Sequence, residues 1–333
     1  MKHLYTFGIL AAALFQAAPA HAALVLTPAG IADGFGLSIF ASGFTSITQE
    51  GPFGITMTSN GNVMVFNYPD SKRYIFSDVD GQTPASALFS PTVTNTGAQG
   101  YSLASGHPYG GDGAGHFVEF NDDGSINHIL TGVSAQPYFG IATNFVNQHI
   151  IATSFSGLID IDPLANGGLG SFRVITPTTG FDGVTVSLDG TTAYVADGSV
   201  VRAYSIATGT LVHTYTGFSF ADGMGVINSN NNLNGQIIVN TNLGEIDLLN
   251  PVTGVFVAIA TGGSRGDFAS PDTTNGTLFL DYTDFVARLS CGSGCSIGSP
   301  APVSGVPEVS SATLLLTGLA ICGLVRIRKF SRP

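Results

Sequence analysis

The chain of 333 residues is poor in charge and rich in glycine: 10% of its residues are charged, 44 are glycine and none is tryptophan. All 22 acidic residues lie between Asp33 and Glu308, and with the six basic residues of that segment they give it a net charge of −16. Such a charge argues against nucleic acid as a partner, because phosphates are bound through lysine and arginine. It is compatible with solubility outside the cell and with cation binding.

The first 22 residues have the pattern of a secretory signal peptide. Lys2 and His3 precede an apolar run, Leu4–Ala18, and the run is followed by Ala20-His21-Ala22, a small-x-small cleavage site. The alternative, an uncleaved membrane helix, needs a longer run. We therefore predict a signal helix over residues 1–22 that is removed after Ala22, and a chain that is exported through the inner membrane.

The next 270 residues or so are organised in repeats of strands. Leu37–Ser42 predicts a single strand that has the pattern of a fourth strand but no first three before it. Six repeats follow at intervals of about 40 to 46 residues, which is the period of propeller blades, and no segment shows a sustained helical period. The repeats start at Gly54, Gly100, Gly140, Gly183, Gly223 and near Asp267. In the second repeat we expect His107–Gly115 to be a loop.

The fourth repeat, Phe181–Thr216, is the clearest. Its apolar or alternating runs are separated by the pairs Asp189-Gly190, Asp197-Gly198 and Thr208-Gly209. Asp-Gly between such runs indicates a hairpin, since glycine accepts the positive φ of a tight turn. Four strands joined by three tight turns form one antiparallel sheet, which is the unit of a propeller blade.

The two ends of the repeat region complement each other. The sixth repeat supplies three strands, and Leu37–Ser42 can supply the fourth, which removes an open sheet edge. We therefore predict an all-β chain with a single six-bladed β-propeller over residues 35–290, with five or seven blades as alternatives. Removal of residues 23–32 is expected to be nearly silent.

The segments DGVTVSLDGTTAYVADGSVVRAYSIATGTLV and ADGMGV resemble the repeats of NHL-type and gluconolactonase-like six-bladed propellers. The likeness covers most of residues 35–290. Gluconolactonase-like enzymes hold a metal in the channel with an early Glu and with Asn and Asp residues. The resemblance points to Glu50, to Asp182 or Asp222, and to Asn144 as the nearest matches, and we assign no catalytic residue.

Three aspartates, Asp182, Asp222 and Asp267, occupy nearly the same position in successive repeats. Inner strands line the channel, so the three carboxylates would meet at one of its mouths, where they suit a hard cation such as Ca²⁺. Like charges this close also raise one another's pKa. The alternative is that each aspartate caps a turn at a strand entry and bonds its own backbone.

Cys291 and Cys295 stand in the sequence CGSGC at the end of the repeats. In an exported chain a disulfide is the first interpretation, and a thiol metal site would need more ligands. Residues 291–305 are rich in Gly, Ser and Pro and predict a linker.

The last segment joins the motif Val306, Pro307, Glu308 to an apolar run, Ala312–Val325, and a basic end. This order, over residues 306–330, resembles the PEP-CTERM sorting tail of exported bacterial proteins, with Val309 in place of the usual proline. The resemblance implies an exosortase-like processing enzyme as a partner, with a transmembrane helix whose basic end stays in the cytoplasm. The alternative is a plain C-terminal membrane anchor.

The sequence therefore predicts a non-enzymatic binding or structural propeller. It would be anchored in the inner membrane before processing and lie at the cell surface or in the extracellular matrix afterwards, with exopolysaccharide or surface proteins as partners. The alternative is a metal-dependent lactonase or lyase that works in the channel.

Overall fold

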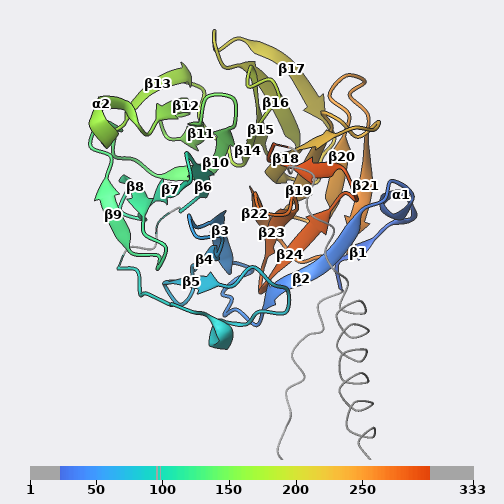
Figure 1. The fold of residues 1–333 in the computed structure, drawn as a ribbon. Coiled ribbons are helices and arrows are strands. Elements are labelled where there is room, and N and C mark those ends of the chain that lie inside the picture. Colours follow the sequence, from blue (N-terminus) through green and yellow to red (C-terminus); the bar gives the residue numbers. More distant parts are fainter. Residues whose placement is uncertain (1–22, 95–96, 98, 301–333) are drawn as a thin grey trace, which may run out of the picture.

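Six antiparallel sheets form a closed ring in the computed structural model, which describes residues 23–94, 97 and 99–300 (Figure 1). The innermost strands β3, β6, β10, β14, β18 and β22 each contact the next around the ring, and β22 contacts β3 again. The all-β, six-bladed prediction is confirmed. The predicted signal helix (residues 1–22) and transmembrane tail (residues 306–330) lie outside the described residues. No helix within the described residues is long and apolar enough to cross a membrane.

The strands of the blades follow one another from the channel outwards. In chain order they are β3 (Pro52–Met57), β4 (Val63–Asn67) and β5 (Lys72–Phe76); β6 (Tyr101–Ala104), β7 (His107–Gly111), β8 (Phe117–Phe120) and β9 (Ile126–Ile129); β10 (Tyr138–Asn144), β11 (His149–Ser154), β12 (Gly157–Asp162) and β13 (Ser171–Thr176); β14 (Val184–Val186), β15 (Thr192–Asp197), β16 (Val200–Ser205) and β17 (Leu211–Thr216); β18 (Ala221–Ser229), β19 (Ile237–Thr241), β20 (Ile246–Leu249) and β21 (Phe256–Thr261); β22 (Gly266–Pro271), β23 (Leu278–Tyr282) and β24 (Phe285–Ser290). Short helical segments lie at Pro84–Ser86 (η1) and Ala165–Gly168 (α2).

The sixth blade is completed by β2 (Gly36–Ser42), which pairs antiparallel with β24 through partners such as Leu37 and Leu289. The predicted closure by the N-terminal strand is therefore confirmed. Phe40 of β2 is fully buried, with its ring 4.8 Å from the ring of Phe279 and 6.0 Å from that of Phe76. One side chain of the closing strand thus packs against both the sixth and the first blade.

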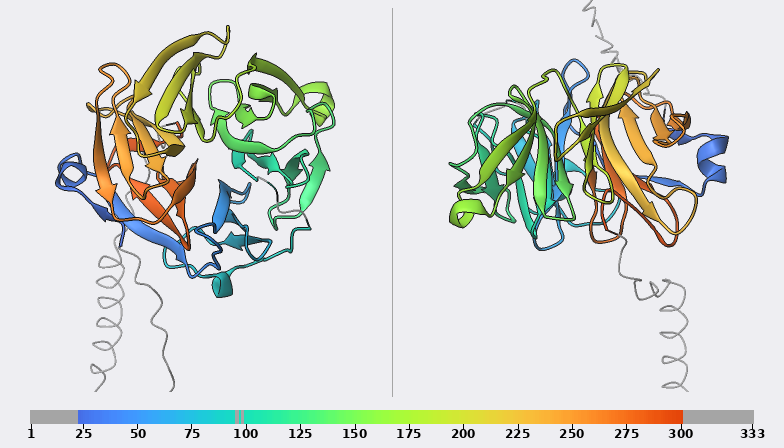
Figure 2. Two further views of the ribbon diagram at one scale, coloured as in Figure 1. Left: turned by 180° about the vertical axis from the view of Figure 1, so that it is seen from behind. Right: turned by 90° about the horizontal axis from the view of Figure 1, so that it is seen from above.

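The residues before β2 also belong to the ring, contrary to the expectation that residues 23–32 can be removed silently. Strand β1 (Val25–Leu26) pairs with β21, and α1 (Pro28–Ala32) follows it on the outer side of the ring (Figure 2). Gly30 packs so closely on blade five that an added Cβ would lie 2.2 Å from the carbonyl oxygen of Ile259. Two paired residues are too short a run for a sequence pattern to reveal.

The expected loop His107–Gly115 is a second difference, because its first five residues form β7, an interior strand of blade two. Tyr109 of this strand is buried. A Cβ on Gly110 would lie 2.3 Å from the carbonyl oxygen of Gly100 and 2.4 Å from the ring of Tyr101. Glycine is present because neighbouring atoms leave no room for a side chain, and not because the chain turns.

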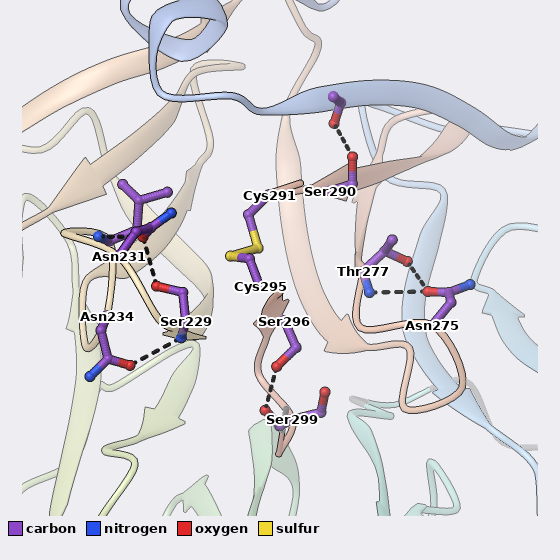
Figure 3. The surroundings of a disulfide bond; sticks show 12 residues. Ser229, Asn231, Asn234, Asn275, Thr277, Ser290, Cys291, Cys295, Ser296 and Ser299 are labelled. Atoms are coloured by element: carbon purple, nitrogen blue, oxygen red, sulfur yellow. Dashed lines mark hydrogen bonds between the residues drawn. A yellow bond between two sulfur atoms is a disulfide. The ribbon is translucent and has the colours of Figure 1, made fainter. Parts of the chain in front are cut away.

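The predicted linker 291–305 is also corrected for residues 291–300, which are packed on the ring. Cys291 and Cys295 are joined by a disulfide, and β25 (Cys295–Ile297) pairs with the end of β18 (Figure 3). Ile297 is fully buried. At the ends of the inner strands, Gly298–Pro300 help to line a cavity of about 210 Å³. The short apolar run CSI is enough to extend a sheet.

Arg288 of β24 joins blade six to the loop that follows β5 in blade one. Its guanidinium donates to Asp80 at 2.8 Å, and to Asp78 and Asp272 at 2.5 Å each. It also lies over the rings of Phe40 and Phe279. The side chains of Arg288 and Asp272 are 9% and 0% exposed, so this ion pair is shielded from water, whereas Asp80 is 42% exposed.

We expect the ring to weaken in two steps as the N-terminus is shortened. A variant that begins at Asp33 loses β1 and α1, and one that begins at Gly51 also loses β2 and Phe40. A fully buried apolar side chain contributes about 1.5–3 kcal/mol, and the net stability of a domain is only about 5–15 kcal/mol. Melting temperatures should fall in the order Ala23, Asp33, Gly51. Equal values for the three starts would show that these strands do not close the ring.

Substitution of Arg288 by Met should lower the free energy of unfolding by about 3–5 kcal/mol, because it leaves the buried Asp272 carboxylate unpaired. The control is Arg202→Met, since Arg202 and Asp197 are each 33% exposed. Loss of that exposed pair should cost less than about 1 kcal/mol. Urea unfolding of the two variants measures the difference, and equal losses would contradict the assigned role of Arg288.

Candidate functional site

At one mouth of the channel, neighbouring inner strands touch backbone to backbone. A Cβ added to the glycine of each of the first five blades would lie 2.0 to 2.7 Å from a carbonyl oxygen of the next blade. Gly54 faces Gln99, Gly100 faces Phe139, Gly140 faces Asp182, Gly183 faces Asp222 and Gly223 faces Asp267. No side chain tolerates that separation, so each of these positions requires glycine.

The residue that precedes each glycine lines this mouth. Five blades contribute Phe53, Gln99, Phe139, Asp182 and Asp222, and the sixth contributes Asp267 at the equivalent position before Phe268. With Glu50, Tyr68, Arg265 and Phe268 they enclose a pocket of about 320 Å³. Phe268 replaces glycine in the sixth blade, and its ring lies 3.1 Å from the Cβ position of Gly100 in blade two. Its side chain therefore reaches across the channel.

The structure brings together the three aspartates that the sequence singled out. Asp222 is 3% exposed, and its Oδ2 accepts from the side-chain amide of Asn242 at 3.1 Å when that amide is turned so that its nitrogen faces the carboxylate. Burial first, and then the charges of Asp182 and Asp267, raise the pKa of Asp222 well above its ordinary value. Burial also raises the pKa of Asp182.

A fourth carboxyl, which the sequence did not reveal, lies behind this group. Asp281 of β23 is fully buried, and its Oδ1 accepts the backbone N–H groups of Asp267, at 3.2 Å, and of Phe268. Among the described residues its Oδ2 has no hydrogen-bond partner. Burial and the charge of Asp267 raise its pKa well above the ordinary value. The signal for Asp281 is weak, because it lies inside an apolar strand, LFLDY.

Arg265 is the positive side chain of the pocket. Its guanidinium lies 3.0 Å from Asp267 Oδ1 and 3.5 Å from Glu50 Oε1, and so connects blade six to the entry of blade one. Burial raises the pKa of Asp267 to about 6, although Arg265 acts in the opposite direction. The effect of burial on the pKa of Asp267 is therefore larger than the opposing effect of its ion pair with Arg265.

Aromatic side chains form the wall contributed by blades one and three. The rings of Phe53 and Tyr68 lie 5.3 Å apart, as do those of Phe139 and Phe155. The pocket thus has aromatic residues from blades one and three and Phe268 from blade six, and carboxyl groups from blades four to six and from Glu50 before blade one. Phe53, Gln99 and Phe139 each precede the glycine at the start of a repeat, so this position in the repeats could have predicted that they line the pocket.

The residues suggested by the gluconolactonase resemblance are only partly brought together. Glu50, Asp182 and Asp222 line the pocket, whereas Asn144 ends strand β10 and donates its amide to the carbonyl of Gly190. Among residues 23–94, 97 and 99–300, no group of three or more His, Cys, Asp or Glu side chains is arranged to hold a metal ion. The Ca²⁺ site therefore stays a prediction.

Solved structures with this fold include a streptogramin B lyase, with 15% identity, a TM-score of 0.51 and coverage of 77% of this chain and 97% of that one. A catalytically inactive virginiamycin B lyase from Staphylococcus aureus with quinupristin has 13% identity, a TM-score of 0.50 and coverages of 77% and 99%. The WD40 propeller domain of Doa1 has 13% identity, a TM-score of 0.52 and coverages of 72% and 78%. No family model and no curated protein matches the chain. Identities this low show the fold alone, so function depends on the site.

The raised pKa of Asp267 predicts a pH-dependent stability. Because the folded state holds this proton up to about pH 6, the contribution of Asp267 is full below about pH 4 and is lost as the pH rises through 6. Asp267→Asn should therefore raise the free energy of unfolding at pH 7.5, by at most about 3 kcal/mol, with little effect at pH 4.

The control for this test is Asp189→Asn in an exposed turn. Hydrogen bonding from Ser187 lowers the pKa of Asp189, so this change should weaken the protein at neutral pH. Urea unfolding of both variants at the two pH values is the measurement. A stabilisation by Asp267→Asn that is equal at both values would contradict the assigned titration.

Proposed function

We propose that the chain is an exported β-propeller that binds a ligand in the channel-mouth pocket without converting it, and that it acts at the cell surface or in the extracellular matrix. The observation that carries the binding role is the convergence of one residue from every blade on one pocket. Because the ring is closed and its inner strands touch through their backbones, these side chains are held in place before a ligand arrives.

An enzymatic role is the alternative, and the site offers one argument for it. A carboxyl with a pKa of about 6, as burial gives Asp267, suits general acid–base catalysis near neutral pH. The fold is also shared with two lyases. However, the inactive virginiamycin B lyase is a histidine-to-alanine variant, and no histidine is among the described residues that line this pocket. We propose binding without turnover because it requires only the preformed pocket.

The cellular part of the proposal rests on the two ends of the sequence. The signal peptide would export the chain, and the sorting tail at Val306, Pro307 and Glu308 would be recognised by an exosortase-like enzyme. Exopolysaccharide or surface proteins are the proposed partners in that compartment. Before processing, the C-terminal apolar run would hold the chain in the inner membrane.

A tryptophan placed in the pocket would report its occupancy, because the chain contains none. Phe139→Trp puts the reporter on the pocket wall, and Phe172→Trp on the outer strand β13 is the control. We expect small amines, sugars or carboxylic acids, titrated as separate classes, to change the emission of the first variant and not the second. Absence of any response from all three classes would overturn the proposed pocket.

The same purified protein decides between binding and catalysis. We expect no hydrolysis of a panel of lactones, and metal analysis reports whether Ca²⁺ or another ion is bound. Stoichiometric metal together with lactone turnover that Asp182→Asn abolishes would replace the binding role with the enzymatic one.

A further inference from the structure

We infer that the pocket selects an organic cation, an ammonium group carried on an apolar stem. This inference rests on the proposed binding role and specifies its ligand class.

The first argument is the balance of charge in the pocket. Four acidic side chains line it, Glu50, Asp182, Asp222 and Asp267, against the single guanidinium of Arg265. That guanidinium is already bound to Glu50 and Asp267. Among the described residues, Asp182 and Asp222 form no ion pair. Burial raises the pKa values of Asp182, Asp222 and Asp267, and a ligand that brings a positive charge would favour their ionised forms and pair with them, whereas an anion would not.

The second argument is the unmatched oxygen behind the pocket. Asp281 Oδ2 is buried and has no hydrogen-bond partner among the described residues, and the charge of Asp281 acts on Asp222. Asp281 does not line the pocket itself, but its Oδ1 holds the backbone of the lining residues Asp267 and Phe268. Burial and the charge of Asp267 raise the pKa of Asp281, and a positive group in the pocket would lower it again and favour the carboxylate.

The third argument is the aromatic half. Phe53, Tyr68, Phe139 and Phe268 line the same pocket. The negative face of an aromatic ring attracts a cation, and the rings also offer apolar contact to the stem that carries it. A bare metal ion would use the oxygens and leave these rings without a role, whereas an alkyl- or arylammonium ion uses both halves.

Two further exposed aromatic residues lie near pocket residues, one in space and one in sequence. Phe155, whose ring packs against Phe139, is 65% exposed, and Phe220, two residues before Asp222, is 54% exposed. Phe220 has a φ of +60°, which is rare for a bulky residue and recurs at functional sites. The ring of Phe155 can contact the part of a ligand that projects beyond Phe139.

The test compares two probes of nearly the same shape, 2-phenylethylamine, which is an ammonium ion at neutral pH, and 2-phenylethanol, which is neutral. Calorimetry on the purified protein should show that the amine binds at least about tenfold more tightly. Asp182→Asn and Asp267→Asn should each weaken the amine about tenfold and leave the alcohol unchanged. Asp247→Asn, which removes a buried carboxyl of β20 outside the pocket, should change neither.

A gain-of-affinity variant guards against misfolding as an explanation. Arg265→Met removes the positive charge that competes with the ligand and should strengthen amine binding severalfold. Equal affinities for amine and alcohol would overturn the inference while leaving a binding pocket in place. Displacement of the amine by one equivalent of CaCl₂ would overturn it in favour of a metal site. No response to any class in the Phe139→Trp titration would remove the pocket altogether.

Discussion

The ring depends on the backbone contact between neighbouring inner strands. At five of the six junctions a glycine lies against a carbonyl of the next blade, at a separation that excludes any Cβ. This contact fixes where each inner strand enters the channel, and it leaves the preceding side chain at the mouth. Ring closure and pocket formation are therefore consequences of the same packing. A larger residue at any of these glycines would push two neighbouring blades apart. It would also displace the lining side chain that each of these blades contributes.

The architecture was predictable because its signal is repeated. Turn pairs at a period near 40 residues, and a strand missing at one end and spare at the other, gave six blades that the structure confirms. The predictions were wrong for short segments that pair with strands far away in the sequence. Strands β1 and β25 have two and three residues, and no local pattern tells which sheet edge they pair with. The prediction of a loop in place of strand β7 was wrong for a different reason. The glycines of this strand are required by close packing, but they were interpreted as glycines required by a turn.

In the candidate site too, residues marked by the repeat were predicted, and residues that depend on a non-local pairing were missed. Asp182, Asp222 and Asp267 were found because aligned repeats place equal positions at equal heights in the ring. Phe53 and Phe139 occupy the same alignment column and were missed because aromatic residues in strands are ordinarily core. Asp281 could not be inferred, because its importance comes from a strand pairing that puts it under Asp267.

The placement of the few basic residues explains how the ring tolerates an acidic pocket. Arg288 holds three aspartates between blades six and one, and Arg73 bonds Tyr101, Gln99 and the carbonyl of Gly124 in blade two. These guanidinium groups join blades at buried positions where an unpaired carboxylate would be costly. At the channel mouth, by contrast, one arginine faces several carboxyls, and burial first, and then the charges of neighbouring carboxyls, raise their pKa values. The arginines that join the blades thus lie away from the pocket, where several carboxyl groups share one basic side chain and where the proposed cationic ligand would pair with them.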